Sequence, residues 1–323
     1  MTSRAGILPY TKSKNAQFGL ISVFGEKSQN WLDLHEGRLG WNLPSHGESY
    51  NHCGSFVKKG CLNPYEHPDI AYVKVIKHSC MRAECPICFE GWAGKEAEKI
   101  VHRLQQYYGR GQPIHVTASV PHGLYNEGMI SLRKKSYKIM KKVGFIGGVC
   151  ISHPFREACQ ICGFEKDWNT KTCVNCGASQ FRWYFSPHFH FLGYGWLRGI
   201  KKNYEETGWV VKNLGVRKTL HGTAMYQLSH AGVHKKYHTV TWFGRLSYNN
   251  FKCKKLVRKE DVCPLCNNSL GYLIWIGEGL CPVPDEKGEY EVSSEGWTEV
   301  YRNLMEGGYY YDGLVETRNI YSE

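Results

Sequence analysis

Two short segments of this chain carry side chains that could act together on a phosphodiester. His188 and His190 are two residues apart in an apolar stretch, so in a β-strand their imidazoles share one face while the neighbouring phenylalanines point to the other. Tyr226 and His230 are four residues apart, which places both on one side of a helix. Three imidazoles and a phenol could share one metal ion and one phosphate group. This pattern indicates an enzyme that cuts a nucleic-acid strand.

Hydrophobic periodicity predicts the elements that position these residues. Strands are expected at 114–120, 145–153, 181–194, 209–214 and 238–246, and helices at 89–108, 130–143 and 221–233. The central order strand–helix–strand–strand–helix–strand is that of the ferredoxin-like, RRM-like split βαβ pattern. We therefore expect an α+β fold in which an antiparallel sheet carries helices on one face. The histidine strand should be central and should face the helix that carries Tyr226, with Met225 and Leu228 packed on the sheet.

Fourteen cysteines are the second prominent feature, and most of them fall in closely spaced groups. Cys159, Cys162, Cys173 and Cys176 form two C-x2-C pairs, each followed by glycine, which is the spacing of a zinc ribbon. This ribbon is inserted between two strands of the expected sheet, just before the histidine strand. We expect it to bind a structural zinc ion.

Two further zinc sites are expected from the remaining cysteines. The first would take Cys80, Cys85 and Cys88, with Cys53, Cys61 or His78 as its fourth ligand. The second would take Cys263 and Cys266, with Cys253 and Cys281 as candidates for the other positions. Cys150 lies in an expected strand and should be a buried, apolar residue. A closed shell of four thiolates leaves no position for a substrate, so none of these sites is expected to be catalytic.

The charge distribution points to a polyanionic partner. The net charge is +12, but residues 282–323 contain ten acidic and three basic residues, a balance of −7, so residues 1–281 carry +19. A basic body of this kind suits nucleic acid. The basic residues expected to contact DNA are Lys134, Lys135, Lys201, Lys202, Arg217, Lys218, Lys235 and Lys236.

The sequence also predicts where the protein works and how the chain is divided. There is no apolar N-terminal segment typical of a signal peptide and no membrane-spanning run, so we expect a cytoplasmic protein without a membrane partner. For a virus- or plasmid-encoded protein this means the cytoplasm of the host. The expected parts are an irregular arm (1–50), a cysteine-rich segment with a basic helix (51–110), a core (111–250) with the ribbon at 155–180, a zinc segment (251–281) and an acidic tail (282–323).

The ordered set of motifs resembles the HUH endonuclease superfamily. The segments that carry the resemblance are Cys80–Cys88 with the Trp92 helix, His188–Leu192, Tyr226–His230 and Thr241–Gly244, and together they span roughly residues 53–270. More narrowly, the chain is similar to the rolling-circle replication initiators (Rep proteins) of archaeal plasmids and viruses.

The resemblance implies a covalent strand-transfer reaction. His188 and His190 would hold Mg²⁺ or Mn²⁺, with His230 as a candidate third ligand. Tyr226 would attack the scissile phosphodiester of single-stranded DNA at a replication origin, leaving a 3′-hydroxyl primer and a 5′-phosphotyrosine. Position 222 is glycine, so we expect a single-tyrosine enzyme, with Tyr237 as the nearest spare phenol. No phosphate-binding G-x-x-x-x-G-K-[ST] motif occurs, so we expect no fused helicase. A host helicase and polymerase should therefore unwind and copy the DNA in each round of replication.

Two other functions remain open from the sequence. The same chemistry could serve a single-tyrosine transposase or a plasmid relaxase. Alternatively, the protein could be a non-catalytic zinc-ribbon nucleic-acid-binding protein in which the histidines are structural or bind metal only. Replacement of Tyr226 by phenylalanine separates these possibilities, because it abolishes activity in the enzymes and leaves nucleic-acid binding intact.

Overall fold

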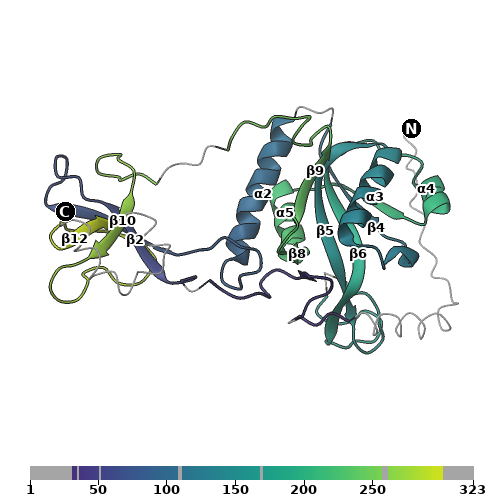
Figure 1. Cartoon of the computed structure of the whole chain (residues 1–323), viewed down its shortest axis with the longest axis horizontal. Helices are drawn as coiled ribbons and strands as arrows, with labels where there is room; N and C mark the ends of the chain where they lie inside the picture. Colours follow the sequence, from purple (N-terminus) through teal and green to yellow (C-terminus); the bar gives the residue numbers. More distant parts are fainter. Residues whose placement is uncertain are drawn as a thin grey trace, which may run out of the picture. The chain divides into compact units, whose positions relative to one another are not determined.

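The computed structural model describes residues 31–34, 36–50, 52–107, 111–167, 170–256 and 261–300. The chain divides into two compact units that are interleaved in sequence. The first unit contains Met1–Asn42, Gly109–Arg217 and His234–Asn250, and the second contains Leu43–Tyr108, Lys218–Val233 and Phe251–Glu323. Figure 1 shows that strands from both ends of the sequence meet in the second unit. The protein is α+β with antiparallel sheets, as expected.

A five-stranded sheet forms the centre of the first unit. Its order is β7-β4-β6-β5-β9, and every neighbouring pair is antiparallel. The strands are β4 (Ile114–Ser119), β5 (Phe145–Cys159), β6 (Phe181–Gly195), β7 (Val210–Val216) and β9 (Val240–Gly244). The histidine strand β6 is therefore central, which confirms the prediction.

The two faces of this sheet differ in character. Helix α3 (Met129–Lys142) lies against β5 and β6, as Figure 1 shows. Its Tyr137 ring stacks on Phe243 with centroids 4.7 Å apart, and Phe191 packs edge-on against both rings. Phe191 is fully buried, so the phenylalanines of β6 point into an aromatic core as expected. Because side chains alternate along a strand, the histidines of β6 face the opposite side.

The remaining elements of the first unit are short. They are β1 (Trp41–Asn42), the 3-10 helix η1 (His122–Leu124) and α4 (Ile200–Thr207). Helix α4 was not predicted, because its eight residues contain few apolar positions. It is flanked by Gly199 and Gly208, both in the left-handed conformation. β1 lies within the segment expected to be irregular, and its Trp41 is buried against the rings of His234 and Tyr237. Residues 1–30 of the predicted arm lie outside the described residues.

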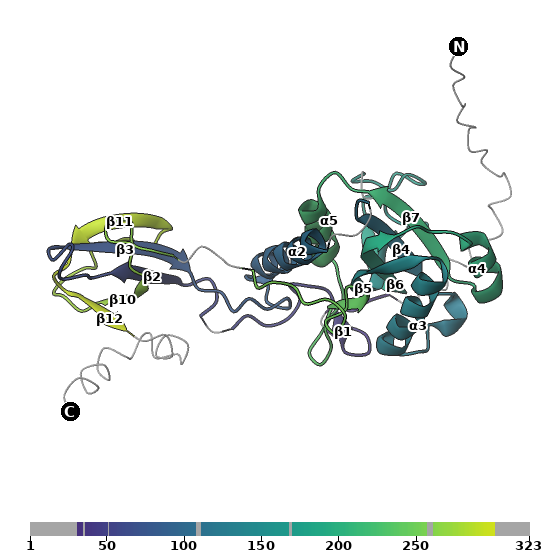
Figure 2. The same cartoon turned by 90° about the horizontal axis from the view of Figure 1, so that it is seen from above.

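The second unit contains another five-stranded antiparallel sheet and two helices. The sheet order is β11-β3-β2-β10-β12. Its strands are β2 (Phe56–Cys61), β3 (Ile70–Lys77), β10 (Gly271–Trp275), β11 (Gly288–Ser293) and β12 (Trp297–Val300). Helix α2 (Phe89–Gln106) packs against α5 (Leu220–Ser229), which precedes β8 (Val233–His234), and the two helices lie side by side in Figures 1 and 2.

Three expectations about the organisation need correction. Helix α5 packs against α2, where Met225 Sδ comes within 3.9 Å of a Cβ built on Gly94, and it belongs to the second unit rather than to a continuous 111–250 core. The segments 51–110 and 251–281, expected as separate parts, fold into the same unit. The part of 282–323 that the structure describes is not a tail, since it supplies β11 and β12.

The strands within residues 282–300 were not predicted because this segment is rich in acidic residues. In β11, Tyr290 and Val292 pack on the core of the second sheet, while Glu289 on the alternate face pairs with Lys74. The carboxylates therefore lie on the outer face of a half-buried strand, which a count of charges does not reveal. Residues 301–323 lie outside the described residues. None of the helices in the described ranges is both long and apolar enough to cross a membrane.

Candidate metal centres and active site

Three histidines meet on the non-aromatic face of the first sheet. One ring nitrogen from each of His153, His188 and His190 lies within 4.8 Å of the others. His153 on β5 is directly opposite His188 on β6 in the strand register, and His190 follows on the same face. All three are buried. Three imidazoles at this separation are a ligand set for one divalent cation.

The two histidines of β6 are oriented by hydrogen bonds at Nδ1. The Nδ1–H of His188 donates to the carbonyl oxygen of Ser186 at 2.9 Å, which leaves the Nε2 lone pair for a metal. His190 Nδ1 lies 2.8 Å from Nε2 of His115, on the adjacent strand β4. With Nε2 of His190 used as the ligand atom, its Nδ1–H donates to His115. Both rings thus have the partner that metal-binding imidazoles usually need.

His115 is suited to accept this hydrogen bond. Burial lowers the pKa of His115 to about 4, and the positive charge of Arg217 lowers it further in the same direction. The ring is therefore neutral at physiological pH and keeps one nitrogen lone pair. His115 was not predicted as part of the site, because its partner is set by the register between two strands.

Tyr226 and His230 lie together on α5 in the second unit. Their ring centroids are 4.6 Å apart, which confirms the expected one-turn relationship. Tyr226 is 50% exposed, so its hydroxyl is not sealed in a core. His230 is the residue that ends the helix, and burial lowers its pKa to about 4 against the opposing effect of the Tyr226 backbone. His230 is therefore neutral, as a ligand must be.

The third histidine of the described cluster is His153. The sequence analysis predicts that His153 lies in a strand but does not include it among the metal ligands. The role of His230 as a third ligand stays a prediction. The sequence does contain a sign that His153 belongs to this cluster. His153 is the last residue of an expected strand that alternates in the same way as the histidine strand. Recognising it requires the β5–β6 register, in which His153 pairs with His188.

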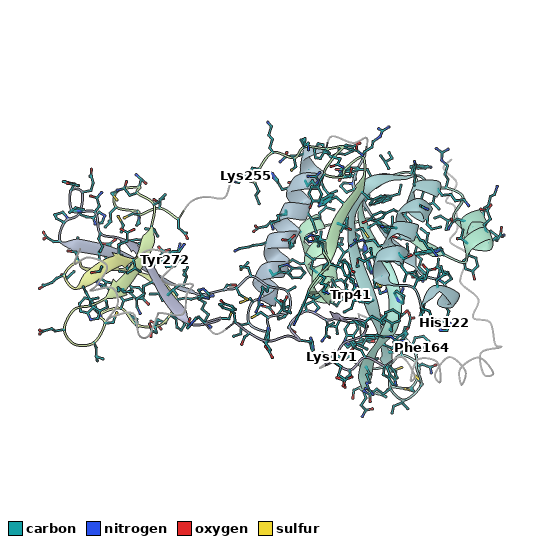
Figure 3. The ribbon with its side chains drawn as sticks, viewed as in Figure 1. Trp41, His122, Phe164, Lys171, Lys255 and Tyr272 are labelled. Carbon is teal, nitrogen blue, oxygen red and sulfur yellow. The ribbon has the colours of Figure 1, made fainter. Side chains whose placement is uncertain are left out.

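The predicted zinc ribbon is assembled as a group of four cysteines. Cys159, Cys162, Cys173 and Cys176 each offer a sulfur atom within 4.8 Å of the others. The Cys159–Cys176 and Cys162–Cys173 sulfur pairs are 3.6 and 3.5 Å apart. The group lies where β5 ends and β6 begins. Phe164 and Lys171, which are labelled in Figure 3, belong to the same segment. It is compatible with zinc binding.

Each half of the ribbon has the same backbone turn. Gly163 N–H donates to the Cys159 carbonyl at 2.9 Å, and Gly177 N–H donates to the Cys173 carbonyl at 2.8 Å. Both glycines have positive φ, +69° and +73°, which is why glycine follows each C-x2-C pair.

A second group contains Cys53, Cys80, Cys85 and Cys88, with their sulfur atoms within 4.8 Å of one another. Of the three candidates for the fourth ligand, only Cys53 belongs to this group, and Cys61 and His78 do not. Helix α2 begins immediately after Cys88, so this group fixes the start of the helix that packs on α5. Like the ribbon, it is compatible with zinc.

The third predicted site has different partners from those expected. Cys263 and Cys266 group with Cys61 and His67, and the predicted Cys253 and Cys281 are not members. Cys61 had been considered only for another site. His67 was missed because a single histidine before a proline carries no spacing signal. Cys150 is fully buried in β5, as expected.

Several of the basic residues predicted to contact DNA have acidic neighbours. Lys135 pairs with Glu127, and Lys201 and Lys202 each lie near a glutamate one turn later on α4. These are exposed pairs that a polyanion could replace at little cost. Lys134 is exposed on α3, and Lys235 and Lys236 follow β8. Arg217 and Lys218 lie between β7 and α5. DNA contact by all eight stays a prediction.

Comparison of the chain with protein-family models, with curated proteins and with solved structures gives no match. The functional assignment therefore depends on the side chains and topology described above.

Proposed function

We propose that this protein is an HUH-type single-strand DNA endonuclease and strand transferase that initiates rolling-circle replication. The observation that carries the proposal is the cluster of His153, His188 and His190, in which a His-x-His pair lies on the central strand of an antiparallel sheet. In this proposal the nucleophile is Tyr226, which is half-exposed on α5 and has His230 one turn later.

The topology of the first sheet supports the same assignment. Helix α3 connects β4 to β5, and α4 connects β6 to β7, while β6 lies between β4 and β5. The order β7-β4-β6-β5 is what a ferredoxin-like split βαβ core requires. In this proposal, β9 is an additional edge strand and the zinc ribbon extends the β5–β6 hairpin.

The histidine donor set fits a divalent cation. Two of the three rings are held through Nδ1, which leaves Nε2 for coordination. Imidazole ligands suit first-row transition metals better than Mg²⁺, so Mn²⁺ is the expected ion of the two. When bound, the cation supplies positive charge that favours the phenolate of the nucleophile and stabilises charge on the phosphoryl oxygens.

The chain's own residues carry the covalent step. The Tyr226 oxygen attacks the scissile phosphorus, the bond from phosphorus to the 3′-oxygen breaks, and that oxygen leaves as a hydroxyl after taking up a proton. The phenol proton passes to solvent or to a neighbouring base, for which neutral His230 is the nearest candidate on the helix. The 5′-phosphotyrosine keeps the energy of the phosphodiester, so the reverse reaction rejoins DNA without a nucleotide cofactor.

A nicking assay tests this proposal. Full-length protein is incubated with Mn²⁺ and end-labelled single strands that tile the replicon encoding it, and products are separated in denaturing gels. Wild-type protein should cut one strand at one site. The Tyr226→Phe variant should cut at least about a hundredfold more slowly. The Tyr237→Phe variant is the matched control and should retain cutting. A Tyr226→Phe variant with wild-type cutting would refute the proposed nucleophile.

A second function is supported by the cysteine groups. Two groups of four cysteines on a basic chain also suit a nucleic-acid-binding protein without catalysis. Wild-type protein that binds the tiled strands in a salt-sensitive manner but cuts none of them would favour this reading. A single-tyrosine transposase or relaxase would cut at a transposon end or transfer origin instead of a replication origin.

A further inference from the structure

The segment Cys263–Cys266 repeats the backbone turn of the zinc ribbon. Cys263 N–H donates to the Asn268 carbonyl at 2.7 Å, and Asn267 N–H donates to the Cys263 carbonyl at 2.8 Å. In the ribbon, Cys173 makes the same pair of bonds at 2.7 and 2.8 Å with the carbonyl of Ala178 and the N–H of Gly177. Asn267 has φ of +60°, in the left-handed region where the ribbon has glycine. Asparagine is among the few side chains that tolerate this conformation.

The remaining two side chains come from the connection between β2 and β3. Cys61, the last residue of β2, has its sulfur 3.6 Å from that of Cys266. His67 Nε2 is 3.6 Å from the sulfur of Cys263, and its Nδ1–H donates to the Ile70 carbonyl at 2.6 Å. This bond leaves the Nε2 lone pair for a metal, the tautomer that a zinc-binding histidine needs.

The distances within this group are those of a tetrahedral site. Zn–S and Zn–N bonds of about 2.3 and 2.0 Å set S···S and S···N separations of about 3.8 and 3.5 Å. A disulfide would bring two sulfurs to about 2.05 Å. The observed 3.6 Å for both the sulfur–sulfur and sulfur–nitrogen pairs matches ligands around one ion.

The group lies where the two segments of the chain that form the second sheet meet. Cys61 and Cys266 are 205 residues apart in sequence. β2 pairs with β10 over only three residue pairs, from Gly271↔Gly60 to Leu273↔Lys58. Cys61, Tyr72 and Cys263 form a small buried cluster at this end of the pairing. A metal here would join the β2–β3 hairpin to the segment that supplies β10, β11 and β12.

We propose that Cys61, His67, Cys263 and Cys266 bind a structural zinc ion that closes the second sheet. The two segments that form the sheet, 56–77 and 261–300, are together shorter than the roughly 70–80 residues below which a hydrophobic core rarely suffices alone. Four metal bonds between segments so far apart in sequence compensate for that small core. The site is independent of the proposed endonuclease activity, since it uses none of its residues.

Thiol labelling of the wild-type protein tests the proposal without any variant. Cys253, Cys266 and Cys281 are all partly exposed, so exposure alone would give them similar reactivity. The proposal predicts that native full-length protein reacts with N-ethylmaleimide at Cys266 at least about tenfold more slowly than at Cys253 and Cys281, because only a free thiolate is a nucleophile. A zinc chelator should remove this difference, while the fully buried Cys150 stays unreactive. Equal labelling of the three cysteines before chelation would overturn the proposal.

Metal content provides a second measurement. The double variant Cys61→Ser/Cys266→Ser should carry about one zinc fewer per chain than wild type by native mass spectrometry. The matched double variant Cys253→Ser/Cys281→Ser should keep the wild-type count. Loss of zinc in the second variant but not in the first would also overturn the proposal and restore the ligands expected from sequence.

Discussion

His115 Nε2 lies 2.8 Å from His190 Nδ1, and both rings are buried between adjacent strands of the first sheet. The contact links an imidazole outside the metal group to one inside it. It orients the His190 ring, and when Nε2 of His190 serves as a metal ligand, its Nδ1–H donates to Nε2 of His115. A histidine that the sequence offered as a strand residue is therefore a positioning residue for the candidate metal centre.

Replacement of His115 should weaken the metal site without removing a ligand. We expect His115→Ala to reduce Mn²⁺ affinity about 10- to 100-fold, the usual effect of losing an outer-shell partner. Titration calorimetry measures this, with the exposed His122→Ala as the control that should bind like wild type. Equal affinity in the two variants would show that His190 needs no support from His115.

The identity of the third imidazole can be decided by comparing two variants. His153 shares the described cluster with His188 and His190, so His153→Ala should lower Mn²⁺ affinity by more than about a hundredfold. His230→Ala should retain affinity within about threefold while slowing DNA cutting. The opposite ranking, with His230→Ala losing the metal, would support the ligand set expected from the resemblance.

The aromatic core opposite the histidines should dominate the stability of the first unit. Phe191 is fully buried among Tyr137, Phe145 and Phe243. We expect Phe191→Ala to reduce the free energy of unfolding by about 3–5 kcal/mol, measured by urea denaturation. The partly exposed Phe164 gives the matched control, for which alanine should cost less than about 1 kcal/mol. Similar losses in both variants would contradict the described core.

The left-handed turn after each C-x2-C pair gives a prediction about backbone strain. A Cβ on Gly177 would meet no atom within 4 Å, so the cost of Gly177→Ala comes only from its φ of +73°. We expect a loss of about 1–2 kcal/mol, seen as faster zinc release to a chelator. Gly123 also has open space around it but has no positive φ, so Gly123→Ala should release zinc at the wild-type rate. Identical rates of zinc release from the two variants would argue against a left-handed turn at Gly177.

Local patterns were sufficient to predict the central part of the fold. Alternation around His188 and Phe189 predicted the strand β6 and its two faces, because these depend on side chains adjacent in sequence. The central position of β6 was predicted from the order of strands and helices along the chain. The spacing of Cys159 to Cys176 gave the ribbon for the same reason, since all four ligands lie in one short hairpin.

What the sequence did not reveal depends on pairing between distant segments. His153 and His115 reach the site only through the registers of β5 and β4 with β6. His67 and Cys61 join Cys263 only after β2 pairs with β10 near the other end of the chain. No local spacing predicts these contacts between distant segments. Cys253 and Cys281, which are nearer in sequence to Cys263 and Cys266, were therefore the more obvious candidates, and neither belongs to the group that the structure brings together.

The most direct test of the central claim is to locate the covalent bond. Wild-type protein is trapped on the cut strand with Mn²⁺, the DNA is digested to the linked nucleotide, and peptides are sequenced by mass spectrometry. The proposed function predicts a single adduct, a 5′-phosphate ester on the Tyr226 side chain. An adduct on another residue, Tyr237 included, or cut DNA with no protein attached, would contradict it.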